Sequence, residues 1–324
     1  MTDAEKLKAP FPYFGGKSVV ANIVWNALGQ PKHYIEPFFG SGAVLLARPE
    51  HKQNEHVETV CDKDGHLANV WRALRFAPDD VAKWADWPVN HADLSARKKR
   101  MIANMPELLP KLIDDENYYD AKMAGYWIWA ASCWIGSGLT RIGQIPHLTD
   151  AGVGVHALGQ IPHVSNAGKG VQGSYNTNIY KWFRALCERL RYVRVVCGDW
   201  TRVCGGNWQD KIGSVGIYFD PPYAVSNRDG VYTEDSFTIA NDVRKWAIDR
   251  GKIPSYKIVI SGYEEHMELV DNHGWTCTSW STSGGYGKTA KKDDSEQRGI
   301  NNRHREYLYF SPNCNRGELQ EELF

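Results

Sequence analysis

The chain has 324 residues, of which 38 are Lys or Arg and 38 are Asp or Glu, so its formal net charge is zero. This balance excludes a polycation that binds nucleic acid by bulk charge, and a hydrophobic content of 42% excludes a mostly disordered chain. The sequence has no run of about 18 apolar residues, no signal-peptide core in its first nine residues, and no C-x-x-C pair among its seven Cys. We therefore expect a cytoplasmic chain of about two domains, without membrane contact or a metal site.

Short strands and helical runs alternate in the first and last thirds of the chain. A helix is predicted at 67–74, and another helical face is formed by Ile179, Trp182, Phe183, Leu186 and Leu190. Strands are predicted at 34–36, 57–61, 193–197, 215–219, 257–261 and 307–310. Strands that alternate with helices predict an α/β fold with a mostly parallel, doubly wound sheet.

The alternation stops between about Trp84 and Asn178. The basic run 97–100 suits a helix, whereas residues 132–178 are nearly uncharged and rich in Gly. There the sequence Gly-Gln-Ile-Pro-His occurs twice, at 143–147 and 159–163. A duplicated loop is the simpler interpretation, and a loop that orders on a partner is the alternative. We predict an inserted module of helices and loops at 84–178, sheet parts at 1–83 and 179–312, and a tail at 313–324.

The motif Asp220-Pro221-Pro222-Tyr223 follows the apolar strand predicted at 215–219. It therefore lies at the carboxyl end of a strand, where open α/β sheets bind ligands. Two prolines fix the backbone, so the Pro221 carbonyl can stand beside the Asp220 carboxylate as a second hydrogen-bond acceptor. Two acceptors suit an amino group, and the Tyr223 ring suits a flat base. A plain proline-rich turn is the alternative, and the companion motifs favour the ligand site.

A second motif, Glu36-Pro37-Phe38-Phe39-Gly40-Ser41-Gly42, links the strand at 34–36 to an apolar helix start. Position 45 is Leu45, so the third glycine of a dinucleotide fingerprint is missing, and a nucleoside without pyrophosphate fits instead. Asp62 ends the next strand, where a carboxylate can bind ribose hydroxyls or cap a helix. Both roles are compatible.

A third motif, Pro12-Tyr13-Phe14-Gly15-Gly16-Lys17-Ser18, precedes a helical run near the N-terminus. Its glycines allow a ligand to approach the backbone closely, and Lys17 can meet a carboxylate. It lacks the leading glycine spacing of a P-loop.

Taken in order, these motifs resemble the Dam-type, alpha-group DNA adenine-N6 methyltransferases. That family has an amino-terminal G-G-K element, E-P-F-x-G-x-G, a ribose-binding acid, an inserted target-recognition domain and then D-P-P-Y. The resemblance covers roughly the first 80 residues and about Tyr192 to Phe310. It implies a Rossmann-like catalytic domain in two parts, S-adenosylmethionine as cofactor and double-stranded DNA as substrate.

The resemblance also assigns roles to single residues. Tyr13 and Lys17 would contact the methionine end of the cofactor, and Asp62 its ribose. Asp199 matches the acid near the cofactor's adenine, with a strand-end turn as an equal alternative. The expected cofactor-binding residues are Tyr13, Gly15, Gly16, Lys17, Glu36, Phe38, Gly40, Gly42, Asp62, Asp199 and Asp220. The expected catalytic residues, which would hold a flipped adenine, are Asp220, Pro221, Pro222 and Tyr223.

Several polar residues are expected to contact DNA. Arg pairs with guanine and Asn or Gln with adenine, while other basic side chains bind phosphates. These residues are Arg97, Lys98, Arg141, Gln144, Gln160, Asn166, Lys169, Lys288 and Arg303. For each one alone, a polar loop or a solvated surface is the plainer interpretation. The insert lacks the family's longer charged hairpin, so specificity for GATC does not carry over.

Three other functions are compatible with parts of the pattern. An RNA adenine-N6 methyltransferase can share D-P-P-Y. A protein-glutamine methyltransferase is disfavoured, because related enzymes carry Asn in place of Asp220. An inactive DNA-binding module is disfavoured because the motifs are intact. The resemblance implies an enzyme of a bacterium or a phage, such as the methyltransferase of a restriction-modification system.

The last residues include Gln320, Leu323 and Phe324. They resemble the peptide with which bacterial DNA-processing proteins dock on the sliding clamp. A frayed amphipathic end is the more economical interpretation.

Overall fold

The chain divides into two compact units. Unit 1 consists of Met1–Gly16, Gly40–Gly42 and Asp62–Asp199, and unit 2 of Lys17–Phe39, Ala43–Cys61 and Trp200–Phe324. Residues 62–83 and 179–199 thus group with the predicted insert and not with the rest of the sheet domain, unlike the predicted boundaries. The computed structural model describes residues 7–11, 17–52, 55–133, 139, 178–222, 237–280 and 306–315.

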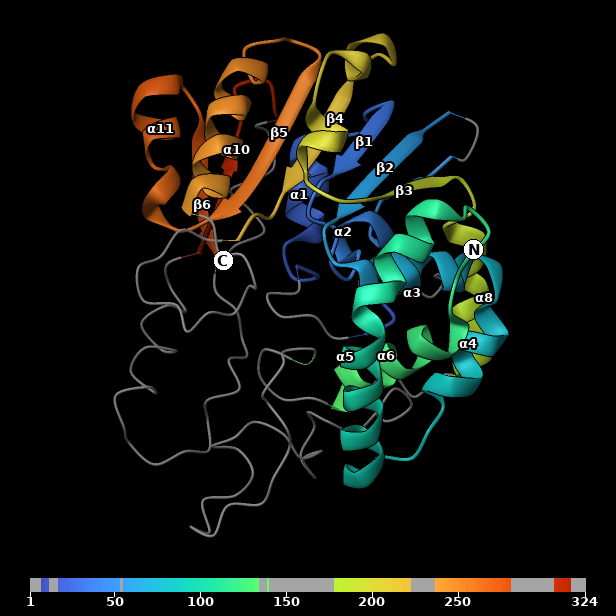
Figure 1. Ribbon diagram of the computed structural model, residues 1–324. Coiled ribbons are helices and arrows are strands. Elements are labelled where there is room, and N and C mark those ends of the chain that lie inside the picture. The colour runs from blue at the N-terminus through green and yellow to red at the C-terminus, as the bar shows by residue number, and fades with distance from the viewer. Residues whose placement is uncertain are drawn as a thin grey trace, which may run out of the picture. The chain divides into compact units, whose positions relative to one another are not determined.

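Within these residues, seven strands form one mixed sheet in the order β3-β2-β1-β4-β5-β7-β6 (Figure 1). β1 pairs in parallel with β2 and β4, and β4 pairs in parallel with β5. β7 is antiparallel to both β5 and β6, so β6 runs parallel to β5 and the sheet is mostly parallel, as predicted, with β7 running in the opposite direction. The strands are His33–Glu36 (β1), Val57–Asp62 (β2), Val193–Cys197 (β3), Val215–Phe219 (β4), Tyr256–Gly262 (β5), Thr276–Trp280 (β6) and Glu306–Phe310 (β7).

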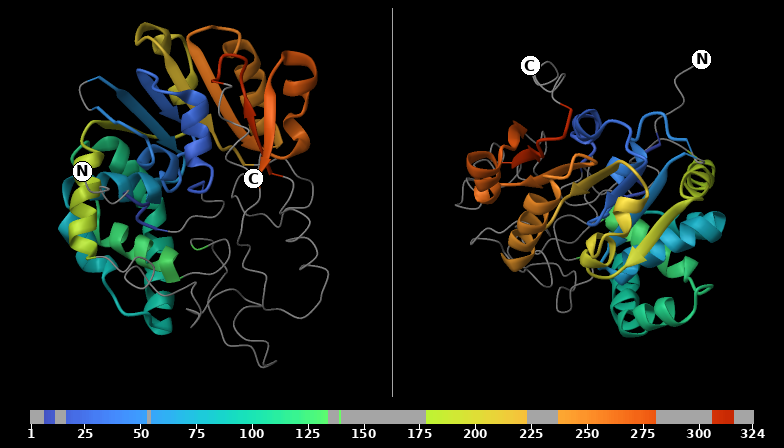
Figure 2. Two further views of the ribbon diagram at one scale, coloured as in Figure 1. Left: turned by 180° about the vertical axis from the view of Figure 1, so that it is seen from behind. Right: turned by 90° about the horizontal axis from the view of Figure 1, so that it is seen from above.

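Unit 2 contains the parallel centre of the sheet. Every residue of β1 and β4 is buried, as expected for strands covered on both faces. A Cβ at Gly216 would lie 2.6 Å from the Pro31 ring, so β4 needs glycine there to approach the loop between α1 and β1. α1 packs against β4 and β5, and α10 against α11 (Figure 2). The helices of this unit are Ala21–Leu28 (α1), Ala43–Leu46 (α2), Thr201–Cys204 (α9), Phe237–Arg250 (α10) and Glu268–His273 (α11), with short 3-10 turns at Trp208–Lys211 and Glu264–His266.

Unit 1 is mainly helical. α6 packs against α3, α4 and α5, and α8 packs against α3 and α4. α8 buries Ile179, Trp182, Phe183 and Leu186, the face that the sequence predicted, and the Asn178 side chain caps its first turn. The helices of this unit are Gly65–Phe76 (α3), Pro78–Ala85 (α4), His91–Asp114 (α5), Ala121–Cys133 (α6) and Ile179–Arg189 (α8).

Candidate active site

The carboxyl ends of β1 and β4 lie side by side in unit 2. The two strands are parallel neighbours, with Ile35 opposite Ile217. Glu36 is the last residue of β1, and Asp220 directly follows β4. Two carboxyl groups from distant parts of the sequence therefore meet at the edge where α/β sheets bind ligands.

Asp220 forms an ion pair with Lys17. The Lys17 Nζ lies 3.1 Å from Asp220 Oδ1, and the two side chains are 6% and 23% exposed. The ammonium also lies 5.6 Å from the centre of the Trp280 ring, which belongs to the last residue of β6. Pro221 is buried and Pro222 half-buried after Asp220. A partly accessible carboxylate is thus held by a buried cation at the start of the double-proline turn.

Glu36 is buried beside this pair. Its Oε2 accepts a hydrogen bond of 2.9 Å from the Tyr34 hydroxyl. Burial raises the pKa of Glu36 well above its ordinary value; the Tyr34 hydrogen bond opposes this rise, and the charge of Asp220 adds to it. The environment therefore favours neutral Glu36. Phe38, two residues on, is half-buried with its ring centre 6.4 Å from that of Phe219.

The glycine turn and the end of β2 form a second predicted group, in unit 1. Gly40 and Gly42 have φ angles of 48° and 68°, a left-handed conformation that glycine adopts without strain. The Gly40 N–H donates to Asp62 Oδ2 over 2.9 Å, and the Asp64 N–H donates to Asp62 Oδ1 over 2.9 Å. The Trp71 Nε1–H donates to the Gly40 carbonyl over 3.3 Å. The Asp62 carboxylate thus fixes the glycine turn.

Asp62 does not cap the following helix. Asp64 does, because its side chain accepts from the His66 N–H. Burial raises the pKa of Asp62 to about 6, although the backbone N–H donors oppose this rise. The cap, an alternative role predicted for Asp62, therefore belongs to Asp64, and the raised pKa of the half-buried Asp62 carboxyl group needs another reason.

Asp199 lies near the same backbone. The Gly198 N–H donates to the Asp62 carbonyl over 2.9 Å, which ties the end of β3 to the end of β2. Asp199 itself is exposed. The structure thus brings Asp62 and Asp199 into neighbouring segments of unit 1.

Two expected DNA contacts need correction. Arg97 and Lys98 are 5% and 2% exposed on the inner face of α5. The Arg97 guanidinium donates to the Trp84 carbonyl and lies over the rings of Trp87, Tyr126 and Trp129. Arg97 is held by these partners and Lys98 is buried, so neither side chain is placed to reach a phosphate, and both contribute to packing instead.

Other predicted site residues lie outside the described residues. They are Tyr13, Gly15, Gly16, Tyr223, Arg141, Gln144, Gln160, Asn166, Lys169, Lys288, Arg303, Gln320, Leu323 and Phe324. The structure adds Tyr34 and Trp280, which the motif analysis did not single out. The sequence contains a signal for Tyr34, because a residue two positions before Glu36 in a strand lies on the same face of the sheet. It contains no such signal for Trp280.

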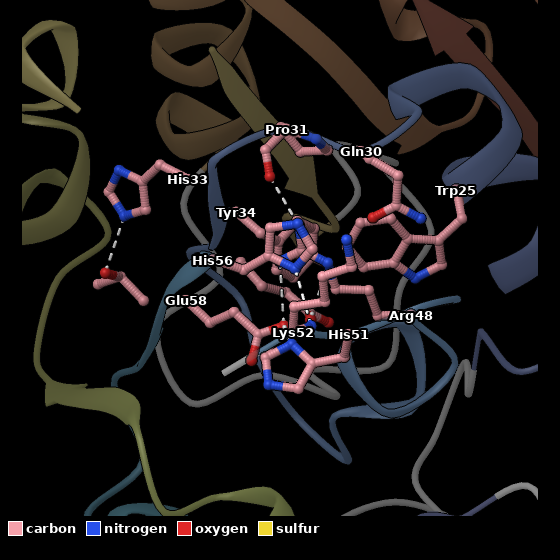
Figure 3. A network of polar contacts seen from close by, with 12 residues as sticks. Trp25, Gln30, Pro31, His33, Tyr34, Arg48, His51, Lys52, His56 and Glu58 are labelled. Carbon is pink, nitrogen blue, oxygen red and sulfur yellow. Dashed lines mark hydrogen bonds and ion pairs between the residues drawn. The ribbon is translucent and has the colours of Figure 1, made fainter. Parts of the chain in front are cut away.

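A second buried cluster of charged residues lies in unit 2, around β2 (Figure 3). The Arg48 Nη1 lies 3.2 Å from Glu58 Oε1, and the Arg48 Nη2 donates to the Pro31 carbonyl over 2.6 Å. The guanidinium lies 5.0 Å from the centre of the Trp25 ring, and the His51 Nδ1 lies 3.4 Å from Glu58 Oε1. The Arg48 and Glu58 side chains are 0% and 2% exposed, so this cluster has no accessible carboxylate to offer a ligand.

Among the described residues, no group of three His, Cys, Asp or Glu side chains is arranged to hold a metal ion. Nor does any helix in that part of the chain have the length and apolarity to cross a membrane. Comparison of the sequence with protein-family models and with curated proteins gave no match.

Proposed function

We propose that the chain is an S-adenosylmethionine-dependent DNA methyltransferase that modifies the N6 amino group of a flipped-out adenine. The observation that carries the proposal is Asp220, a partly exposed carboxylate at the end of a buried parallel strand, followed by two prolines and paired with a buried lysine. The other support is the ordered set of motifs that resembles the Dam-type enzymes.

The chemistry assigned to Asp220 follows from its acceptor capacity. An adenine amino nitrogen is a weak nucleophile, because its lone pair is delocalised into the ring. When its hydrogens bond to the Asp220 carboxylate and the Pro221 carbonyl, electron density stays on the nitrogen and the attacking geometry is fixed. Orientation of this kind supplies a large part of a barrier reduction. Asp220 is also the group in place to take the proton that the nitrogen loses.

The residues present fit the proposed cofactor in chemical type. S-adenosylmethionine supplies, when bound, an electrophilic methyl group on a sulfonium. The Asp62 carboxylate accepts backbone N–H groups from Gly40, Asp64 and Lys63, and a carboxylate has about four acceptor positions, so capacity for a ribose hydroxyl remains. In the family pattern Lys17 and Phe38 serve the amino-acid end of the cofactor and its pocket.

The base must leave the duplex for this chemistry. Unstacking costs a few kcal/mol, and stacking on an aromatic side chain returns about 1–3 kcal/mol. The resemblance gives that stacking role to Tyr223, next to Pro222.

Methyl transfer to nucleic acid tests the proposal. Purified protein is incubated with S-adenosylmethionine that carries a tritiated methyl group, in parallel with unmethylated duplex DNA and with RNA. We expect label in DNA, its loss in Asp220→Asn, and its retention in Asp249→Asn, a control at an 82% exposed aspartate in the same unit. Label in RNA alone would favour the RNA methyltransferase. No label in either acceptor would contradict the proposal.

A further inference from the structure

Lys17 is the cation of a sheltered pair, unlike other lysines that pair with carboxylates. The Lys52, Lys111 and Lys252 side chains are 60%, 48% and 69% exposed in their pairs with Glu55, Glu107 and Asp249. The Lys17 side chain is 6% exposed. Removing an ammonium group from water costs several kcal/mol, so its place beside Asp220 needs a compensating interaction.

The surroundings of Lys17 direct its charge to Asp220. Its Nζ lies 3.1 Å from Asp220 Oδ1, a distance at which ion pairing and hydrogen bonding combine. The Trp280 ring, with its centre 5.6 Å away, adds a weaker attraction and limits where the ammonium can move. Another carboxyl group at this edge, Glu36, is buried and held by the Tyr34 hydroxyl. The 3.1 Å distance makes Asp220 a direct anionic partner of Lys17.

We propose that Lys17 is a positioning residue that acts on methyl transfer through Asp220. By holding Oδ1, the ammonium restricts rotation of the carboxylate and so sets the direction in which its second oxygen meets the amino group of the base. This inference rests on the proposed function. It assigns Lys17 a role in the chemical step, beyond the cofactor contact that the resemblance implies.

The two roles of Lys17 predict different kinetics. A residue that only binds the cofactor raises KM or Kd when it is removed, and saturating cofactor restores the rate. A residue that orients Asp220 lowers the rate constant even with both substrates saturating. Its loss should also not add to the loss of Asp220, because residues that act as a unit are non-additive.

The test is a double-mutant cycle on the single-turnover rate constant, measured with saturating S-adenosylmethionine and duplex DNA. The variants are Lys17→Met, Lys17→Arg, Asp220→Asn and Lys17→Met with Asp220→Asn. Lys252→Met is the matched control, because it removes an exposed lysine that pairs with an aspartate at 3.6 Å. Titration calorimetry with S-adenosylhomocysteine gives the cofactor-site affinity of each variant without turnover.

We expect Lys17→Met to slow the single turnover about 100-fold at saturation, Lys17→Arg to recover about tenfold of that loss, and the double variant to match Asp220→Asn within about threefold. Lys252→Met should match the wild type. If Lys17→Met does not fold, the cycle uses Lys17→Arg, which keeps the charge but changes its reach and should still slow the saturated rate.

A Lys17 variant that reaches the wild-type rate at saturating cofactor, or losses that multiply in the double variant, would overturn the positioning role and leave the proposed function intact. A wild type that methylates neither DNA nor RNA would overturn both.

Discussion

Two buried ion pairs in unit 2 differ in how accessible their carboxylates are, and this difference distinguishes a structural pair from a candidate ligand site. The Arg48–Glu58 pair is closed: both side chains are at most 2% exposed, and the guanidinium also binds a backbone carbonyl and lies over a tryptophan (Figure 3). The Lys17–Asp220 pair is open on one side, because the Asp220 side chain keeps 23% of its surface accessible. A closed pair has no accessible oxygen to offer a ligand, whereas an open pair at a strand end can take one.

The comparison shows that burial of charge is by itself a poor sign of function. Both pairs would count as unusual in a survey of buried residues. What distinguishes them is position. Asp220 stands at the carboxyl end of a parallel strand before two prolines, while Glu58 lies within β2 with its charge enclosed. If the distinction holds, substitutions at the two pairs should change different properties of the protein.

Replacing the open carboxylate should remove activity and spare the fold. We expect Asp220→Asn to lower kcat at least about 1,000-fold, or about 4 kcal/mol of barrier, because an amide presents one acceptor oxygen instead of two. Urea unfolding should show a much smaller change in stability than in activity. A variant with more than about a tenth of the wild-type kcat would remove Asp220 from the catalytic role.

Breaking the closed pair should have the opposite outcome. Arg48→Met leaves Glu58 buried without its main cation, which typically costs about 3–5 kcal/mol of unfolding free energy. Lys52→Met, at an exposed pair nearby, should cost less than about 1 kcal/mol. Urea titrations below the melting temperature measure both. An Arg48→Met protein with normal stability and lost activity would reverse the assignment of the two pairs.

The raised pKa of Asp62 predicts a particular pH dependence of stability. The folded protein binds this proton more tightly than the unfolded chain, since the pKa rises from 3.8 to about 6. The contribution of Asp62 to stability should therefore be greatest below about pH 4 and fall as pH rises through 6, by up to about 3 kcal/mol.

Asp62→Asn lacks this titration, so the wild type should lose stability relative to it between pH 4 and pH 7. Other titrating groups are common to both proteins and cancel in the difference. If the difference in unfolding free energy between the two proteins stays constant with pH, the pKa of Asp62 is not raised in the folded protein.

The smallest expected effect concerns the support of Glu36. Tyr34→Phe removes the hydroxyl that donates to Glu36 Oε2 and leaves a buried carboxyl oxygen without that donor. We expect a loss of about 1–3 kcal/mol in unfolding free energy with the fold retained. The same measurement on Tyr192→Phe, a 55% exposed tyrosine, is the control and should show almost no change.

The sequence predicts the centre of the sheet well, because its strands are short, apolar and buried on both faces. The residues of β3 and β4 agree with the predicted ranges, β1, β2 and β7 differ from theirs by one residue at one end, and β5 is longer by one residue at each end. β6 was not predicted. Thr276–Trp280 is polar and half-exposed, and among the described strands it pairs with β7 at the edge of the sheet, so it lacks the apolar signal of a central strand.

The candidate site was predicted as a set of residues and not as a set of contacts. Motif spacing identified Lys17 and Asp220, but their pairing depends on how distant segments meet, which local periodicity does not encode. A helix cap was one of two compatible roles predicted for Asp62, and it belongs to Asp64, two residues away, a shift within the usual error of boundary prediction. The sequence predicts Arg97 and Lys98 as DNA contacts on the surface, because a charge run in a helix usually faces solvent. The aromatic rings around Arg97 come from other segments of the chain, so the local sequence does not reveal them.

The most direct test of the central claim is the chemical identity of the product. Unmethylated plasmid DNA is incubated with the protein and S-adenosylmethionine, digested to nucleosides and analysed by mass spectrometry, with Asp220→Asn as the paired reaction. The account predicts N6-methyldeoxyadenosine in the wild-type reaction and none in the variant. Methylation of cytosine, an equal yield from the variant, or no methylated nucleoside at all would contradict it.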